Sequence, residues 1–145
     1  MVDAIIDSIR TWLKEENIQY NIREDNESDY HLQFWISRGL QLDVVVKGDK
    51  LMVSASIQFS NASVNIFRTE SSRFHKLDLE LHQQITRFTF LYADIKNTQL
   101  VGVKIFKDIW AESLTKTSFF DAAAAVEHSY YIVAVNEREL TTLNR

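Results

Sequence analysis

The chain has 145 residues, 46% of them hydrophobic and 25% charged, which is ordinary for a globular protein, so we expect a single domain over residues 1–145. Its net charge is −4 and its basic residues are scattered, so we do not expect nucleic acids or acidic membrane surfaces as partners. The first residues lack the basic and apolar segments of a signal peptide, and no run approaches transmembrane length, so we expect a cytoplasmic protein.

The first predicted element is a helix from Asp3 to Glu16, because apolar residues recur there at helical spacing. A helix lying on a membrane surface would carry mainly Lys and Arg on its polar face, whereas this polar face is mixed and slightly acidic. We therefore expect the helix to cover a core. A short strand over residues 18–24 and a solvated acidic turn over residues 24–29 are predicted to follow.

Three consecutive strands are predicted over residues 30–59, because apolar and polar side chains alternate there with a period of two. Two turns set their pairing: a two-residue hairpin at residues 48–49, and a three-residue turn at residues 37–39 with Gly39 in the left-handed conformation. The expected pairs are Ile36 with Leu40, Phe34 with Leu42, Val46 with Leu51, Val44 with Val53, and Leu42 with Ala55. These registers place the apolar residues of the alternation on one face.

A helix is predicted between about Ala62 and Thr86, with a break near residues 68–72 left open. The residues expected to face inward from it are Phe74, Leu77, Leu81 and Ile85. A fifth strand is predicted from the alternation of Phe88, Phe90 and Tyr92, and a sixth from that of Val101, Val103 and Ile105, running to about Trp110. Residues 96–98 between these two strands are expected to form a turn.

The last predicted helix runs from Ser118 to about Glu139, and residues 118–121 resemble a capping box with Asp in place of Glu. Apolar residues cover more than half of its circumference, so we expect it to lie deep in the core or to meet a partner. The predicted fold class is therefore α+β. We expect a mainly antiparallel sheet, a four-stranded meander plus a two-strand hairpin, with three helices in the order α-β-β-β-β-α-β-β-α.

Motifs that carry chemistry are missing from the sequence. The chain has no cysteine, and its three glycines lie too far apart to cradle a phosphate. It contains no G-x-S-x-G, H-E-x-x-H or C-x-x-C motif. We therefore expect no cofactor and a non-catalytic protein.

One group of residues has the spacing of metal ligands. His75, Asp78 and His82 would share one face of the predicted second helix, within reach of a single cation. No fourth ligand is evident nearby, so we expect polar surface residues there and no metal site. His31 and His128 stand alone in the sequence, and a catalytic role for either would need a partner that the sequence does not indicate.

The predicted registers also define the second face of the meander. They place Val45 between His31 and Met52, and Trp35 opposite Gln41. Trp35, Val45 and Met52 would form a partly apolar patch on this face, and Trp and Met are enriched at protein interfaces. The alternatives are that the first or last helix covers the patch, or that its residues are simply exposed.

Residues 109–121, Ile-Trp-Ala-Glu-Ser-Leu-Thr-Lys-Thr-Ser-Phe-Phe-Asp, resemble a segment of a family of uncharacterised archaeal proteins. In that family the end of a strand is similarly followed by a leucine-threonine turn, and Phe and Asp then open the last helix. The order of the predicted elements is similar to the type III secretion chaperone-like α/β fold. The resemblance implies that fold, without any enzyme activity or functional residues. Secretion chaperones dimerise and hold extended partner segments.

Two functional hypotheses follow. The first is a protein-interaction module of the chaperone or adaptor kind, expected to be a homodimer in the cytoplasm, acting through the patch of Trp35, Val45 and Met52 or through Tyr130 and Tyr131 of the last helix. The second is a small-ligand-binding or enzymatic domain with a pocket between sheet and helices. The aromatic residues that could line such a pocket are Tyr92, Trp110, Tyr130 and Tyr131.

Overall fold

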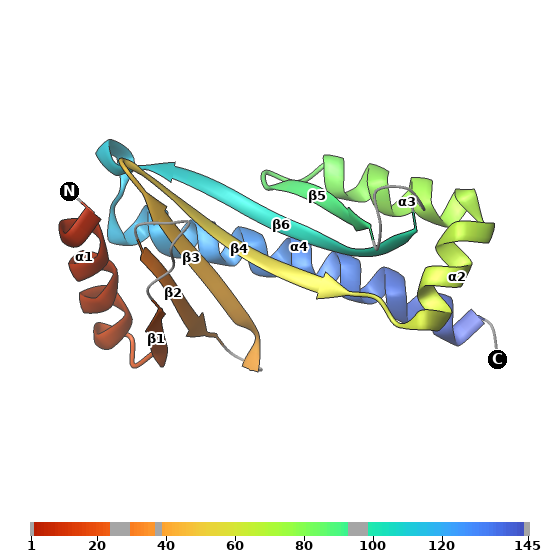
Figure 1. Ribbon diagram of the computed structural model, residues 1–145, viewed down its shortest axis with the longest axis horizontal. Coiled ribbons are helices and arrows are strands. Elements are labelled where there is room, and N and C mark those ends of the chain that lie inside the picture. Colours follow the sequence, from red (N-terminus) through yellow and green to blue (C-terminus); the bar gives the residue numbers. More distant parts are fainter. Residues whose placement is uncertain (1, 24–29, 37–38, 93–98, 144–145) are drawn as a thin grey trace. The chain divides into compact units, whose positions relative to one another are not determined.

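The computed structural model describes residues 2–23, 30–36, 39–92 and 99–143 (Figure 1). The elements in chain order are α1 (Val2–Glu15), β1 (Tyr20–Arg23), β2 (Tyr30–Trp35), β3 (Gln41–Lys47), β4 (Lys50–Gln58), α2 (Asn61–Thr69), α3 (Ser71–His82), β5 (Arg87–Tyr92), β6 (Leu100–Trp110), a short 3-10 helix (Ala111–Ser113) and α4 (Lys116–Leu143). The strands follow the order β1-β2-β3-β4-β6-β5 in a six-stranded sheet. The α+β fold class and the antiparallel meander are confirmed. The predicted turns at 24–29 and 96–98, and residues 37–38, lie outside the described residues.

The registers of the meander agree with the alternation in the sequence. Strands β2, β3 and β4 are antiparallel, and the observed pairs include Phe34 with Leu42, Val44 with Val53, and Val46 with Leu51. Gly39 and Gly48 have φ angles of 74° and 63°, a backbone conformation that glycine adopts without steric cost. The turn residues therefore set the pairing that buries one face of these strands.

The chain divides into two compact units. Unit 1 comprises Met1–Ala55 and Phe106–Val126, and unit 2 comprises Ser56–Ile105 and Glu127–Arg145. Strands β4 and β6 and helix α4 each contribute residues to both units. The expectation of a single domain over residues 1–145 stays a prediction.

The core of unit 1 lies between α1, the first turns of α4 and the apolar face of the meander. Ile5, Ile6, Ile9 and Leu13 share one buried face of α1, as its amphipathic pattern predicts. The ring of Phe119 from α4 is fully buried, with its centroid 5.6 Å from that of Phe34 in β2. The two helices thus meet the meander on its apolar side.

Helix α1 ends at an asparagine in the left-handed conformation. Asn17 has a φ angle of 56°. Its N–H donates to the carbonyl of Lys14 (3.1 Å), and the N–H of Ile18 donates to the carbonyl of Leu13 (2.9 Å). This pair of hydrogen bonds is the Schellman arrangement, which satisfies carbonyls at the end of a helix. The chain is thereby turned from α1 into β1.

Helix α4 begins earlier than predicted. The hydroxyl of Thr115 accepts the N–H of Ser118 (3.0 Å), and the hydroxyl of Ser118 accepts the N–H of Thr115 (2.8 Å). The reciprocal bonds of a capping box are therefore present, but Thr115 is the cap and Ser118 takes the place usually held by Glu. The predicted box at residues 118–121 was one turn too late. Lys116 also joins this end of α4 to α1, with Nζ 2.7 Å from Glu15 Oε2.

In unit 2, the predicted long helix is two helices, which corrects the expected number of three helices to four in the described part of the chain. The break falls at Glu70, within the range left open for it. Leu77 and Leu81 are buried as predicted and Phe74 is half-buried. Ile85 was expected to face inward, but it is 75% exposed because α3 already ends at His82.

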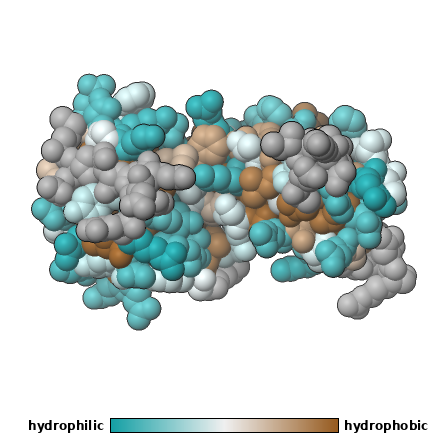
Figure 2. All heavy atoms as spheres, in the orientation of Figure 1, coloured by the Kyte–Doolittle hydropathy of each residue, from teal (hydrophilic) through white to brown (hydrophobic). Residues whose placement is uncertain are grey.

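Polar and aromatic contacts complete the core of unit 2. Thr86 and Ser129 are buried, and their hydroxyl oxygens lie 2.6 Å apart, so each satisfies the other away from water. The ring centroids of Phe59 and Phe67 are 5.0 Å apart, and those of Phe74 and Phe90 are 4.9 Å apart. Figure 2 shows apolar side chains that still reach the surface over unit 2, among hydrophilic ones.

Candidate functional site

The second face of the meander in unit 1 carries three of the residues predicted to meet a partner. Trp35, Val45 and Met52 are all half-buried. Val45 lies between His31 and Met52, as predicted, and Trp35 lies opposite Gln41. Trp35 is four residues from His31 along β2, which corresponds to about 13 Å. The three residues therefore do not form one continuous patch.

Two polar residues separate Trp35 from Val45 and Met52. The pair Gln33 and Asp43 lies between Trp35 and Val45 in the ladder of β2 and β3. His31 Nε2 lies 3.1 Å from Asp43 Oδ1, so the histidine that stands alone in the sequence has a carboxylate partner in the structure. The proposed contact of Trp35, Val45 and Met52 with a partner stays a prediction.

The other two predicted interface residues lie in unit 2. Tyr130 and Tyr131 of α4 stack edge to face, with ring centroids 5.6 Å apart. Tyr130 lines a hollow with Ile57 of β4, whereas Tyr131 lines a second hollow with Glu80 of α3. Consecutive residues of α4 thus open onto different surfaces of this unit.

The histidines of α3 are engaged with their own helix and its neighbour. The Nδ1 of His82 donates to the carbonyl of Asp78 (2.8 Å), and the His82 ring meets Phe88 edge to face at 4.9 Å. The ring of His75 lies 5.9 Å from that of Phe74. Within the part of the chain that the structure describes, no three His, Asp or Glu residues are grouped to hold a metal ion.

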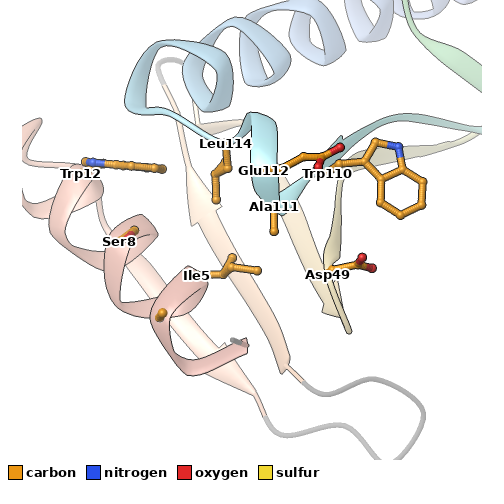
Figure 3. A pocket seen from close by; sticks show the side chains of 9 residues that line it. Ile5, Ser8, Trp12, Asp49, Trp110, Ala111, Glu112 and Leu114 are labelled. Carbon is orange, nitrogen blue, oxygen red and sulfur yellow. The ribbon is translucent and has the colours of Figure 1, made fainter.

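A pocket in unit 1 brings two tryptophans together with apolar residues, and we call it the tryptophan groove (Figure 3). Its volume is about 750 Å³. It is lined by Ala4, Ile5, Ser8, Trp12, Asp49, Trp110, Ala111, Glu112 and Leu114. These residues come from three segments that are distant in the sequence: residues 4–12 of α1, the β3–β4 turn, and residues 110–114, which run from the end of β6 through the 3-10 helix.

Local structure explains how these segments meet. Ala4, Ser8 and Trp12 recur every four residues, so they share one side of α1. The N–H of Ala111 donates to the carbonyl of Asp49 with a length of 2.7 Å, which ties the 3-10 helix to the β3–β4 turn. Figure 3 shows Trp12 and Trp110 at the two ends of the groove, with Ile5, Ala111 and Leu114 between them.

The groove combines an apolar floor with an acidic rim. Among the described residues that line the groove, the charged ones are Asp49 and Glu112, and both are exposed. Lys50 lies nearby, over the Trp110 ring at 5.7 Å from its centroid, but its ammonium group pairs with Asp108 at 3.1 Å. The local charge at this rim is therefore negative. Trp110 is 53% exposed, which is unusual for so large an apolar side chain.

Sequence reasoning found this site only in part. Trp110 was among the aromatic residues suggested to line a pocket, but Tyr92, Tyr130 and Tyr131 belong to unit 2 and do not line the groove. Trp12 belongs to the first predicted helix, which was expected to cover a core, and no surface role was predicted for it. The signal that could have indicated the groove was the segment from Trp110 to Leu114. This segment comes at the end of a predicted strand, and its apolar residues no longer alternate with polar ones.

Among the described residues, no helix is both long and apolar enough to span a membrane.

Comparisons with known proteins identify the family and the fold. The family model described as "Uncharacterized conserved protein (DUF2299)" matches residues 5–135. A crystal structure of an uncharacterized protein from Methanothermobacter thermautotrophicus is similar over 92% of this chain and 97% of its own, with a TM-score of 0.78 and 14% identity. YbjN from E. coli, assigned as a candidate transcription regulator, is similar over 96% of this chain and 93% of its own, with a TM-score of 0.53 and 13% identity. None of the curated proteins matches the sequence. At these identities the likeness shows a YbjN-like fold, and the expectation of an uncharacterised family is confirmed.

Proposed function

The chain belongs to the DUF2299 family of uncharacterized conserved proteins, and we propose that it is a non-catalytic protein-interaction module that binds a partner segment in the tryptophan groove. The observation that carries this proposal is the composition of the groove: two tryptophans at its ends, an apolar floor, and an acidic rim. Tryptophan is the residue type most enriched among those that dominate binding energy at protein interfaces.

The shape of the groove favours a peptide segment as its occupant. One wall is the side of helix α1, and the opposite wall is the short segment after β6. Grooves of this kind bind a partner through apolar side chains that repeat along a helix or an extended segment. The groove is open at the surface, and the exposed Trp110 is available to cover such a segment.

The charge of the rim defines the chemistry of the partner. Asp49 and Glu112 are both exposed beside the apolar floor. A segment that places apolar side chains on the floor and a lysine or arginine at the rim is complementary in both respects. The net charge of −4 favours the approach of a cationic segment as well.

The proposal is tested by titrating the protein with two synthetic peptides of about 12 residues, one built from leucine and lysine and the other from leucine and glutamate. The chain has three tryptophans, and two of them line the groove. In a Trp35→Phe background, fluorescence therefore reports on Trp12 and Trp110. We expect the leucine–lysine peptide to change the emission and bind, and the leucine–glutamate peptide to do neither.

Charge variants connect binding to the rim. Glu112→Gln and Asp49→Asn should each weaken binding of the leucine–lysine peptide about two- to fivefold, since exposed ion pairs contribute up to about 1 kcal/mol. Asp121→Asn is the matched control, because Asp121 is exposed on α4 and does not line the groove. Equal binding of both peptides, or equal effects of all three variants, would contradict the proposal. Thermal stabilisation by a small metabolite without peptide binding would favour the ligand-binding alternative instead.

A further inference from the structure

One side of α4 within unit 2 is apolar and open to solvent. Val135 is 47% exposed and Ile132 is half-buried, while another side of the helix buries Ser129, Val133 and Leu140. Val135 and Ile132 also line a hollow of about 290 Å³, and the other residues that line it are Glu80, His128, Tyr131, Asn136 and Glu139. This unit therefore presents two aliphatic side chains of α4 at its surface, with polar residues around them.

The α3–α4 surface is held in place by polar contacts on either side of the hollow. Asn136 Nδ2 donates to Glu80 Oε2 (2.8 Å), and Lys76 Nζ lies 3.1 Å from Glu139 Oε2. Because these contacts connect α3 to α4, the apolar side chains between them are displayed on a fixed backbone. A fixed surface loses less entropy when a partner docks than a mobile one does.

The residues along this side of α4 have the spacing of a helix-pairing seam. His128, Ile132, Val135 and Glu139 are separated by four, three and four residues, the alternation that keeps side chains along one seam between two packed helices. The polar residues are at the ends of the seam and the aliphatic residues are in its middle. His128 and Glu139 are both exposed.

The order of these residues is self-complementary. If a second α4 crosses antiparallel with a two-fold axis between Val133 and Ala134, residue 128 of each copy faces residue 139 of the other, and residue 132 faces residue 135. Each histidine then meets the Glu139 carboxylate, which Lys76 of the same copy as that carboxylate also contacts, and aliphatic side chains meet at the centre. A parallel crossing would instead place His128 beside His128 and Glu139 beside Glu139, which gives no such complementarity.

We propose that a second copy of the chain docks on this surface, pairing His128 with Glu139 and Ile132 with Val135 across a two-fold axis. The hollow beside Val135 leaves room for a side chain of the second copy, as interdigitated helix packing requires. The seam spans twelve residues from His128 to Glu139, or about 17 Å of helix, which is short for an interface. The dimer is therefore weak, with a dissociation constant in the micromolar range or above. This proposal uses unit 2 alone and does not depend on the tryptophan groove.

Sedimentation equilibrium over protein concentrations from about 5 to 500 µM tests the proposal, a range chosen to bracket weak association. The mass is expected to rise from 16.9 kDa towards twice that value. His128→Glu places two carboxylates opposite each other and is expected to raise the dissociation constant at least fivefold. Adding Glu139→His to that variant restores opposite partners and should return the constant to within about twofold of the parent.

Two further variants complete the test. Val135→Lys is expected to keep the protein at 16.9 kDa, and because Val135 is 47% exposed the substitution should leave the circular dichroism spectrum unchanged. Asn65→Glu adds the same charge as His128→Glu at an exposed position on α2 and should leave the dimer intact. A monomer at every concentration, a dimer that Val135→Lys does not affect, or a double variant no better than His128→Glu would overturn the proposal.

Discussion

Glu137 on α4 shows how burial affects a single charge. Burial raises the pKa of the Glu137 carboxyl above its ordinary range, and the N–H of Ser60, 3.4 Å from Oε1, offsets part of this effect. Ser60 also caps α2, where its hydroxyl accepts the N–H of Ser63 at 3.2 Å. The Glu137 carboxylate therefore accepts an N–H at the start of α2, but its burial removes part of its hydration and so disfavours its charged form.

This cost has a defined pH dependence. A carboxyl whose pKa is higher in the folded chain than in the unfolded chain holds its proton more tightly when folded. The free energy of unfolding thus decreases as pH rises through the interval between the two pKa values, and it stays lower above that interval. Glu137→Gln removes the charge and keeps an oxygen that can accept the N–H of Ser60. We expect the variant to be more stable than the parent at pH 7, by less than about 1 kcal/mol because the site is partly solvated.

Urea denaturation at pH 7 and at about pH 3.5, below the ordinary pKa of Glu, measures this difference. The advantage of Glu137→Gln should be present at pH 7 and absent at the lower pH. Glu127→Gln, at another half-buried position of α4, serves as the control. The interpretation fails if Glu137→Gln is no more stable than the parent at pH 7, or if its advantage persists in acid.

The residue scale also shows where local sequence signals are ambiguous. Thr115 and Ser118 can both cap a helix, and the sequence alone did not distinguish them. The structure uses both, because the cap at Thr115 lets Ser118 return a hydrogen bond. His31 illustrates a different limit. Its partner Asp43 is twelve residues away and becomes its neighbour only through the pairing of β2 with β3.

At the scale of elements, a glycine allows a close approach between two strands of unit 2. A Cβ atom at Gly102 of β6 would lie 2.3 Å from the carbonyl oxygen of Ile57 in β4. This is far inside van der Waals contact with backbone, so the strands would have to separate locally.

We therefore expect Gly102→Ala to destabilise the protein by about 1–3 kcal/mol, the range observed for overpacked sites. Lys104→Ala provides the comparison, since it changes a half-buried residue of the same strand. Thermal unfolding of both variants measures the effect. If the two midpoints agree within error, the proposed close approach of the two backbones is wrong.

The elements themselves were predictable wherever periodicity was strong. The meander followed from strict alternation between residues 30 and 59, and α1 followed from its apolar stripe. The end of α3 was not predictable from the sequence. Ile85 lies four residues after Leu81 and so extends the apolar helical spacing, but α3 ends at His82. For the break between α2 and α3 at Glu70, the sequence predicted only that a break could lie near residues 68–72.

At the scale of the whole molecule, the fold class could be predicted from the sequence, whereas the tryptophan groove could not. The α+β order could be derived because each element depends on its own residues and on short turns. The tryptophan groove depends on α1, the β3–β4 turn and the end of β6 meeting in space, and contacts such as the hydrogen bond between Ala111 and Asp49 form only once the chain is folded. The division into two units was likewise not visible in composition, because no linker rich in glycine or proline separates them.

The central claim is that a cationic, apolar segment binds in the tryptophan groove, and hydrogen exchange followed by mass spectrometry tests it most directly. With the leucine–lysine peptide present, backbone exchange is predicted to slow in residues 4–12 and 109–114, including the N–H of Ala111 that bonds to Asp49. Exchange in residues 128–139 of α4 should stay unchanged. Protection on α4 or on strands β2 and β3, with none at residues 109–114, would contradict the account.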